Sequence, residues 1–146
     1  MSYSVEEFDR LKTKVMNYIM YKKRTEYEVK NKFSKTIEEN LLNDIIEYVK
    51  EAGYLSDTKY IERAIQEFIS LNNLSRKEVR YKLYSKGIQN DLIEDYFSIH
   101  SDELYEYELK SAENIKIKKQ STMDEDEIKN YLRKKGYIED IIKEIF

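Results

Sequence analysis

The sequence contains no cysteine, proline or tryptophan, and it has only three glycines and one histidine. Without cysteine, disulfides and thiolate metal sites are excluded. The shortage of glycine and proline disfavours strands joined by tight turns and favours helices. No apolar run is long enough to span a bilayer, and the first residues lack the basic start and apolar centre of a signal peptide. We therefore expect an all-α protein of the cytoplasm.

Residues typical of catalytic sites are also scarce. His100 lies in a connection between two expected helices, where a polar surface role explains it best. The glycines are scattered and form no phosphate-binding loop. The acidic run 124–127 is better explained by a helix start, because the helix dipole attracts acids there, than by a metal site. The sequence thus predicts neither an enzyme nor a cofactor.

The composition is that of a folded domain with a mixed charge pattern. The 146 residues are 40% hydrophobic and 38% charged, with a net charge of −3. That net charge disfavours strong binding of nucleic acid by the chain as a whole, since phosphate binding depends on lysine and arginine. Basic residues nevertheless gather in four stretches: Lys22–Arg24, Arg76–Lys86, Lys116–Lys119 and Arg133–Lys135.

An internal repeat organises the chain. The stretch "YLRKKGYIEDIIKEIF" at 131–146 nearly repeats "KLYSKGIQNDLIEDYF" at 82–97. A capping box, in which a Ser, Thr or Asp is followed three residues later by Glu, precedes each stretch at Ser75 and Asp124. The same signal occurs at Thr25. Three boxes at a spacing of roughly 50 residues predict a tandem repeat.

Each copy has the pattern of three helices. A long helix is expected over 5–22, 57–71 and 102–119, followed by the capped helix and by a short third helix that begins at Ile37, Ile88 or Tyr137. Gly87 and Gly136 are expected to end their capped helices in the left-handed conformation, whereas the first copy has no such glycine and must close its turn differently.

A three-helix unit of this size buries too little apolar area alone, so neighbouring units are expected to stack. The prediction is an elongated, curved array of three repeats, with boundaries at 1–55, 56–99 and 100–146. Such an array uses an extended surface rather than a pocket for binding.

The capped helix of the middle repeat predicts one such surface. If Val79 and Leu83 face the core, the flanking and opposite faces carry basic and aromatic side chains. A basic strip with interleaved aromatics suits phosphate or an acidic protein surface, although a solvated helix face explains any single charge run as well. These side chains are Arg76, Lys77, Arg80, Tyr81 and Tyr84.

Two segments resemble a known family. "EAGYLSDTKYIERAI" at 51–65 resembles the junction of the RecX family, where a turn opens the long helix of the next repeat. "LSRKEVRYKLYSKGI" at 74–88 is similar to that family's second-repeat signature. The resemblance extends from about Leu11 to Phe146, with departures at Ile61, where the family usually has alanine, and in the first-repeat turn.

The resemblance implies a non-enzymatic regulator of the RecA recombinase in DNA repair and recombination. Such proteins bind RecA and lie along its filament on single-stranded DNA, altering ATP hydrolysis and strand exchange, usually by inhibition. The implied protein is a monomer without cofactor or membrane partner that meets single-stranded DNA mainly through the filament. The candidate RecA- or DNA-facing residues are Arg76, Lys77, Arg80, Tyr84, Lys22, Lys23, Arg24, Arg133, Lys134 and Lys135.

The sequence leaves two alternatives open. Three-helix units resemble helix-turn-helix modules, so the chain could be a DNA-binding protein that acts without RecA. DNA binding of that kind falls steeply with ionic strength. The other alternative is a helical adaptor for a different protein.

Overall fold

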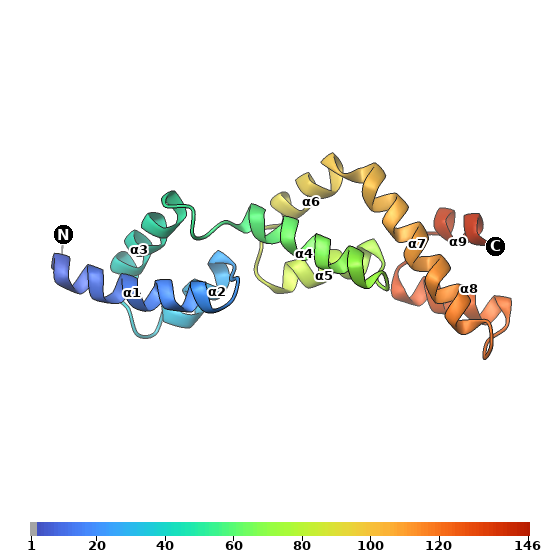
Figure 1. Cartoon of the computed structure of the whole chain (residues 1–146), viewed down its shortest axis with the longest axis horizontal. Helices are drawn as coiled ribbons and strands as arrows, with labels where there is room; N and C mark the ends of the chain where they lie inside the picture. The colour runs from blue at the N-terminus through green and yellow to red at the C-terminus, as the bar shows by residue number, and fades with distance from the viewer. Residues whose placement is uncertain (1–2) are drawn as a thin grey trace. The chain divides into compact units, whose positions relative to one another are not determined.

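The computed structural model describes residues 3–146, and within them every regular element is a helix (Figure 1). The predicted all-α class is confirmed. None of the described helices is both long and apolar enough to cross a membrane. The helices are α1 (Val5–Tyr21), α2 (Glu26–Phe33), α3 (Glu39–Glu51), α4 (Asp57–Leu71), α5 (Arg76–Ser85), α6 (Asn90–Ile99), α7 (Ser101–Lys119), α8 (Glu125–Lys135) and α9 (Glu139–Ile145).

By their packing, the described residues form two units. The first runs to Tyr60 and takes in the turn Lys86–Ile88, and the second comprises Ile61–Ser85 and Gln89–Phe146. The turn that follows α5 therefore belongs with the first helices of the chain. The division into three repeats at 1–55, 56–99 and 100–146 stays a prediction.

The capped helices begin as the sequence predicts. Thr25 and Asp124 each form a complete capping box, in which the cap side chain accepts from a backbone N–H and the glutamate three residues on accepts from the cap. Ser75 does the same with Glu78, through bonds of 3.1 and 3.0 Å. Ser4 likewise accepts from the Glu7 N–H at the start of α1. These local bonds satisfy N–H groups that a helix start leaves unpaired.

The ends of the capped helices follow the glycine pattern. Gly87 and Gly136 have φ values of +78° and +98°, the left-handed conformation expected of them. The first copy closes its turn without glycine: Ser34 is right-handed, and the N–H groups of Thr36 and Ile37 both donate to the Phe33 carbonyl oxygen.

The third helices start later than predicted. Ile37, Ile88 and Tyr137 precede α3, α6 and α9 by two residues each, as the helix bounds show, and lie buried in the turns. Ile37 and Tyr137 share the hydrophobic periodicity of the helix that follows because each lies in the same core as that helix. Apolar spacing alone does not separate a helix from a buried turn in front of it.

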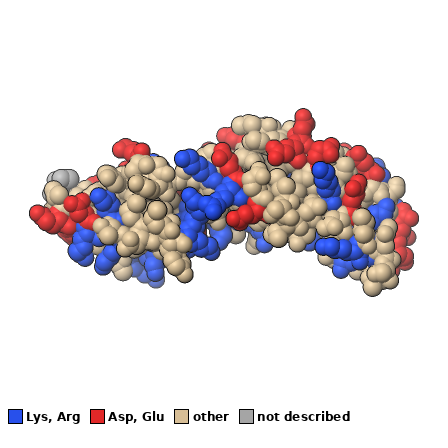
Figure 2. Space-filling view, in the orientation of Figure 1, with Lys and Arg blue, Asp and Glu red and all other residues tan. Residues whose placement is uncertain are grey.

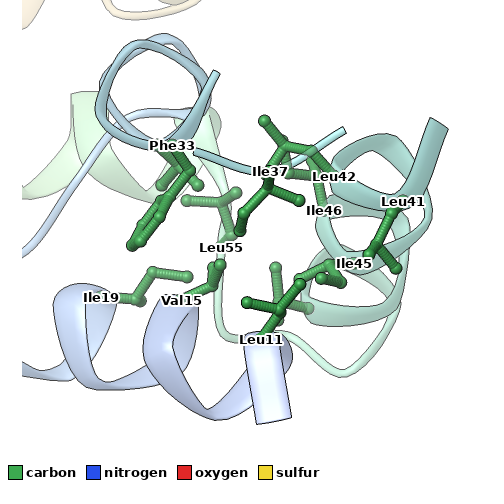
Figure 3. Packing of buried hydrophobic residues seen from close by; sticks show 12 residues of the cluster. Leu11, Val15, Ile19, Phe33, Ile37, Leu41, Leu42, Ile45, Ile46 and Leu55 are labelled. Atoms are coloured by element: carbon green, nitrogen blue, oxygen red, sulfur yellow. The ribbon is translucent and has the colours of Figure 1, made fainter. Parts of the chain in front are cut away.

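Each unit has its own hydrophobic core. In the first, α1, α2 and α3 contribute side chains from three directions, and the buried turn residue Leu55 joins them (Figure 3). In the second, α7 packs against both α8 and α9 around a core that includes Ile115, Leu132 and Ile141. These cores fix which faces of the capped helices α2 and α8 remain exposed.

Candidate interaction surface

The cap hydroxyls of α2 and α5 do more than start their helices. Thr25 Oγ1 accepts from the Glu28 N–H and donates to the Lys86 carbonyl oxygen at 2.7 Å. Ser75 Oγ accepts from the Glu78 N–H and donates to the Lys135 carbonyl oxygen, also at 2.7 Å. Both cap residues are fully buried. A hydroxyl suits this position because it donates and accepts at once.

In both contacts the acceptor is the carbonyl oxygen of a lysine that is followed by a glycine. The Lys135 ammonium lies 3.2 Å from a Glu78 carboxylate oxygen, and Lys86 and Glu28 approach to 4.0 Å. The adjoining glycines lie so close to the capped helix that an added Cβ would collide with Tyr27 at Gly87 and with Lys77 at Gly136. The lysine–glycine turns and the capped helices are therefore fitted to each other within each unit.

Side chains of α7 hold the turn in front of α5. The Tyr107 hydroxyl accepts from the Leu74 N–H at 3.3 Å, and Ser111 Oγ donates to the Leu74 carbonyl oxygen at 3.0 Å. Ser111 is also hydrogen-bonded to the Tyr137 hydroxyl. Burial raises the pKa of both tyrosines, that of Tyr137 far above its usual range. The turn is thus fixed by neutral hydroxyls in a buried network.

An ion pair completes this attachment. Glu108, whose side chain is 1% exposed, accepts from the Arg76 N–H at 3.1 Å and from Arg76 Nε at 2.6 Å. The Arg76 guanidinium also lies over the Tyr105 ring, 5.4 Å from its centroid. Arg76 is therefore committed to the interior of the second unit. Because its guanidinium already contacts Glu108 and Tyr105, Arg76 is a poor candidate for binding a partner.

The exposed face of α5 carries three side chains on successive turns. Tyr81 is 71% exposed and Tyr84 64%, and Lys77 is exposed one turn before them. Arg80, on the flank, is paired with Glu94 at 2.9 Å and lies over the Phe97 ring. The predicted burial of Val79 and Leu83 is confirmed. We call Lys77, Tyr81 and Tyr84 the α5 stripe.

The other two basic clusters are only partly available. Lys22 and Lys23 are exposed after α1, whereas the Arg24 guanidinium lies 3.9 Å from the Tyr18 ring centroid. Arg133 is paired with Glu139, which lowers the pKa of that carboxyl through a hydrogen bond. Lys135 is paired with Glu78 as described above. Lys134 is exposed, and basic side chains are visible around α8 in Figure 2.

Comparison with known proteins places these features in a family. No family model matches the chain. The chain is 33% identical over 141 residues to regulatory protein RecX of Finegoldia magna, covering 89% of the chain and 67% of that protein. The chain belongs to the RecX family of regulatory proteins. RecX of Clostridioides difficile is 25% identical over 145 residues, with 68% of its length covered. RecX of Streptococcus mutans has 52% of its length covered.

Solved RecX structures share the fold. The crystal structure of RecX from Lactobacillus salivarius aligns with a TM-score of 0.80 at 24% identity, covering 97% of this chain and 96% of that one. A second crystal structure of a regulatory protein RecX also gives a TM-score of 0.80, at 18% identity. The helical arrangement described here is thus that of RecX proteins.

Several residues that shape this RecX surface were not predicted from the sequence. Glu108 has the appearance of a solvated helix acid, and its partner Arg76 lies 32 positions away. Neither Ser111 nor Tyr107 lies in a local sequence pattern that predicts its hydrogen bond to Leu74.

Among residues 3–146 there is no group of three or more histidine, aspartate or glutamate side chains arranged to hold a metal.

Proposed function

We propose that the chain binds RecA and its filament on single-stranded DNA and modulates the ATPase and strand-exchange activities of RecA, most often by inhibition. It acts by binding, without catalysis or a cofactor, as a monomer in the cytoplasm where RecA works. Membership of the RecX family of regulatory proteins is the observation that supports this proposal. The α5 stripe supplies a surface of suitable chemistry.

The exposed cations without an ion pair are the strongest candidates for the contact. A carboxylate partner offsets the charge of an arginine and occupies some of its donors, so Arg76, Arg80 and Arg133 contribute less than their charge suggests. The proposed contact residues are therefore Lys77 and Tyr84, together with Lys22, Lys23 and Lys134. Tyrosine and lysine side by side suit both phosphate and an acidic protein surface.

The test is the DNA-dependent ATPase of RecA, measured with and without the chain. We expect the rate to fall at stoichiometric amounts of the chain, and an unchanged rate at excess would count against the proposal. The variant Lys77→Glu with Tyr84→Ala is expected to weaken the effect. Lys59→Glu serves as the control, because Lys59 is also exposed but lies on α4.

DNA binding without RecA gives a different result. A protein that binds duplex DNA through several phosphates loses affinity steeply as salt rises. Tight, salt-sensitive binding to bare duplex, with no change in the RecA ATPase, would favour the DNA-binding alternative. We expect only weak binding to bare duplex because the net charge is −3.

A further inference from the structure

A groove opens within the second unit. It has a volume of about 580 Å³ and is formed by the end of α4, the turn that follows it and the first half of α7. Seven residues line it: Ile69, Ser70, Asn72, Glu103, Glu106, Tyr107 and Lys110. Four of these, Ser70, Glu103, Glu106 and Lys110, are exposed, so the groove is open to solvent.

The floor of the groove is apolar, and its rim carries two acids, Glu103 and Glu106, and one base, Lys110. Ile69 is half-buried and Tyr107 is buried, and both present carbon surface to the groove. Glu103 and Glu106 stand one turn apart on α7, and Figure 2 shows acidic side chains gathered where α6 meets α7. Glu103 lies 3.5 Å from His100 Nδ1. No lysine or arginine of the described chain forms an ion pair with Glu106.

The wall formed by the α4–α5 turn is held by hydrogen bonds. Asn72 has a φ of +54°, an unusual value for a residue other than glycine. Its carbonyl oxygen accepts from Asn114 Nδ2 at 3.2 Å, and two residues later Leu74 is held by Tyr107 and Ser111. A site held in this way is already formed before binding, which lowers the entropic cost of association.

We propose that this groove, which we call the acidic groove, docks a segment of the regulated protein that carries a lysine or arginine next to an aliphatic side chain. The aliphatic group would cover Ile69 and the Tyr107 ring, and the cation would lie between Glu103 and Glu106. Nucleic acid is disfavoured as an occupant because its phosphates would face these carboxylates. The identification of that protein as RecA rests on the proposed function.

The acidic groove and the α5 stripe differ in charge and suit different kinds of partner. A protein that binds a nucleoprotein filament meets both anionic phosphate and polypeptide. The stripe is basic and aromatic, whereas the groove is acidic and apolar, so the two surfaces suit different components of the same target. Two modest contacts on one molecule reinforce each other through effective concentration.

The experiment measures binding of the full chain to RecA filaments assembled on single-stranded DNA. The variant Glu103→Lys with Glu106→Lys is expected to weaken binding by roughly tenfold or more, because both acidic charges at the rim are reversed. Ser70→Trp fills the groove without changing its charge and should also weaken binding. The control is Glu47→Lys with Glu51→Lys, which makes the same charge change on two exposed glutamates of α3.

A small diazirine-bearing photocrosslinking residue at position 70, which unlike tryptophan leaves the groove open, identifies the occupant. With wild-type side chains elsewhere, we expect a crosslink to the RecA polypeptide, and a crosslink to DNA would overturn the inference. If the wild-type chain binds filaments and both groove variants bind equally well, the inference fails and the proposed function stands. If the wild-type chain binds no filament, the proposed function and the inference both fail.

Discussion

The Ser75 hydroxyl donates to the Lys135 carbonyl oxygen across 60 positions of sequence, while it also accepts from the backbone N–H that starts α5. Thr25 has the same relationship to Lys86. The third cap residue, Asp124, is exposed. Its carboxylate accepts from the Glu127 N–H at the start of α8, which is the role of a helix cap. A carboxylate has no hydrogen to donate to a carbonyl oxygen at neutral pH. The two caps that also donate to a carbonyl oxygen therefore carry a hydroxyl, whereas the exposed cap that accepts from its helix is an aspartate.

Replacing the hydroxyl by a carboxylate tests this reasoning. Ser75→Asp keeps the capping interaction but buries a charge against the Lys135 carbonyl oxygen. We expect it to lower the free energy of unfolding more than Ser75→Ala, which should cost about 1–3 kcal/mol. Urea denaturation checks the order. Asp124→Ser, at the exposed cap, should change stability by less than about 1 kcal/mol, and equal costs at both positions would contradict the account.

The glycine after α5 gives a second prediction. Gly87→Ala combines a left-handed backbone with a collision, since its Cβ would lie 2.1 Å from Tyr27 Cγ. Gly53 has a similar φ of +84°, but nothing lies within 4 Å of the position that its Cβ would take. Gly53→Ala should therefore cost only the backbone strain, about 1 kcal/mol, and Gly87→Ala clearly more. Thermal unfolding of the two variants measures the difference.

The two arginines of α5 should differ in their contribution to stability. Arg76→Ala leaves the buried Glu108 carboxylate unpaired, and we expect a loss of about 3–5 kcal/mol. Arg80→Ala removes an exposed pair with Glu94 and should cost less than about 1 kcal/mol. Chemical denaturation of both variants is the measurement. Similar small losses would show that the Arg76 pair does not hold the α4–α5 turn.

Asp57 predicts a pH dependence. Burial raises the pKa of this carboxyl above its ordinary value of 3.8, although it accepts from the Glu26 N–H at 2.9 Å. Because the folded state then binds the proton more tightly than the unfolded state, the Asp57 contribution to stability falls as pH rises from 3.8 through the folded pKa. Asp57→Asn keeps an acceptor oxygen and should flatten the stability profile there. An unchanged profile would contradict this assignment.

The sequence predicted the parts of the fold that depend on neighbours in the chain. The capping boxes at Thr25, Ser75 and Asp124 are confirmed because their bonds span three residues. The buried role of Arg76 was not predicted, since its partner lies on another helix. The acidic groove was not predicted for the same reason, because Ile69 and Glu106 are far apart in the sequence and line one groove only in the folded chain. Whether the predicted contact residues face RecA stays a prediction.

The most direct test of the central claim is an image of RecA filaments on single-stranded DNA after the chain is added. We expect density for the chain along the filament, with the α5 stripe and the acidic groove turned towards it. Filaments that stay bare at a saturating amount of the folded chain would contradict the account.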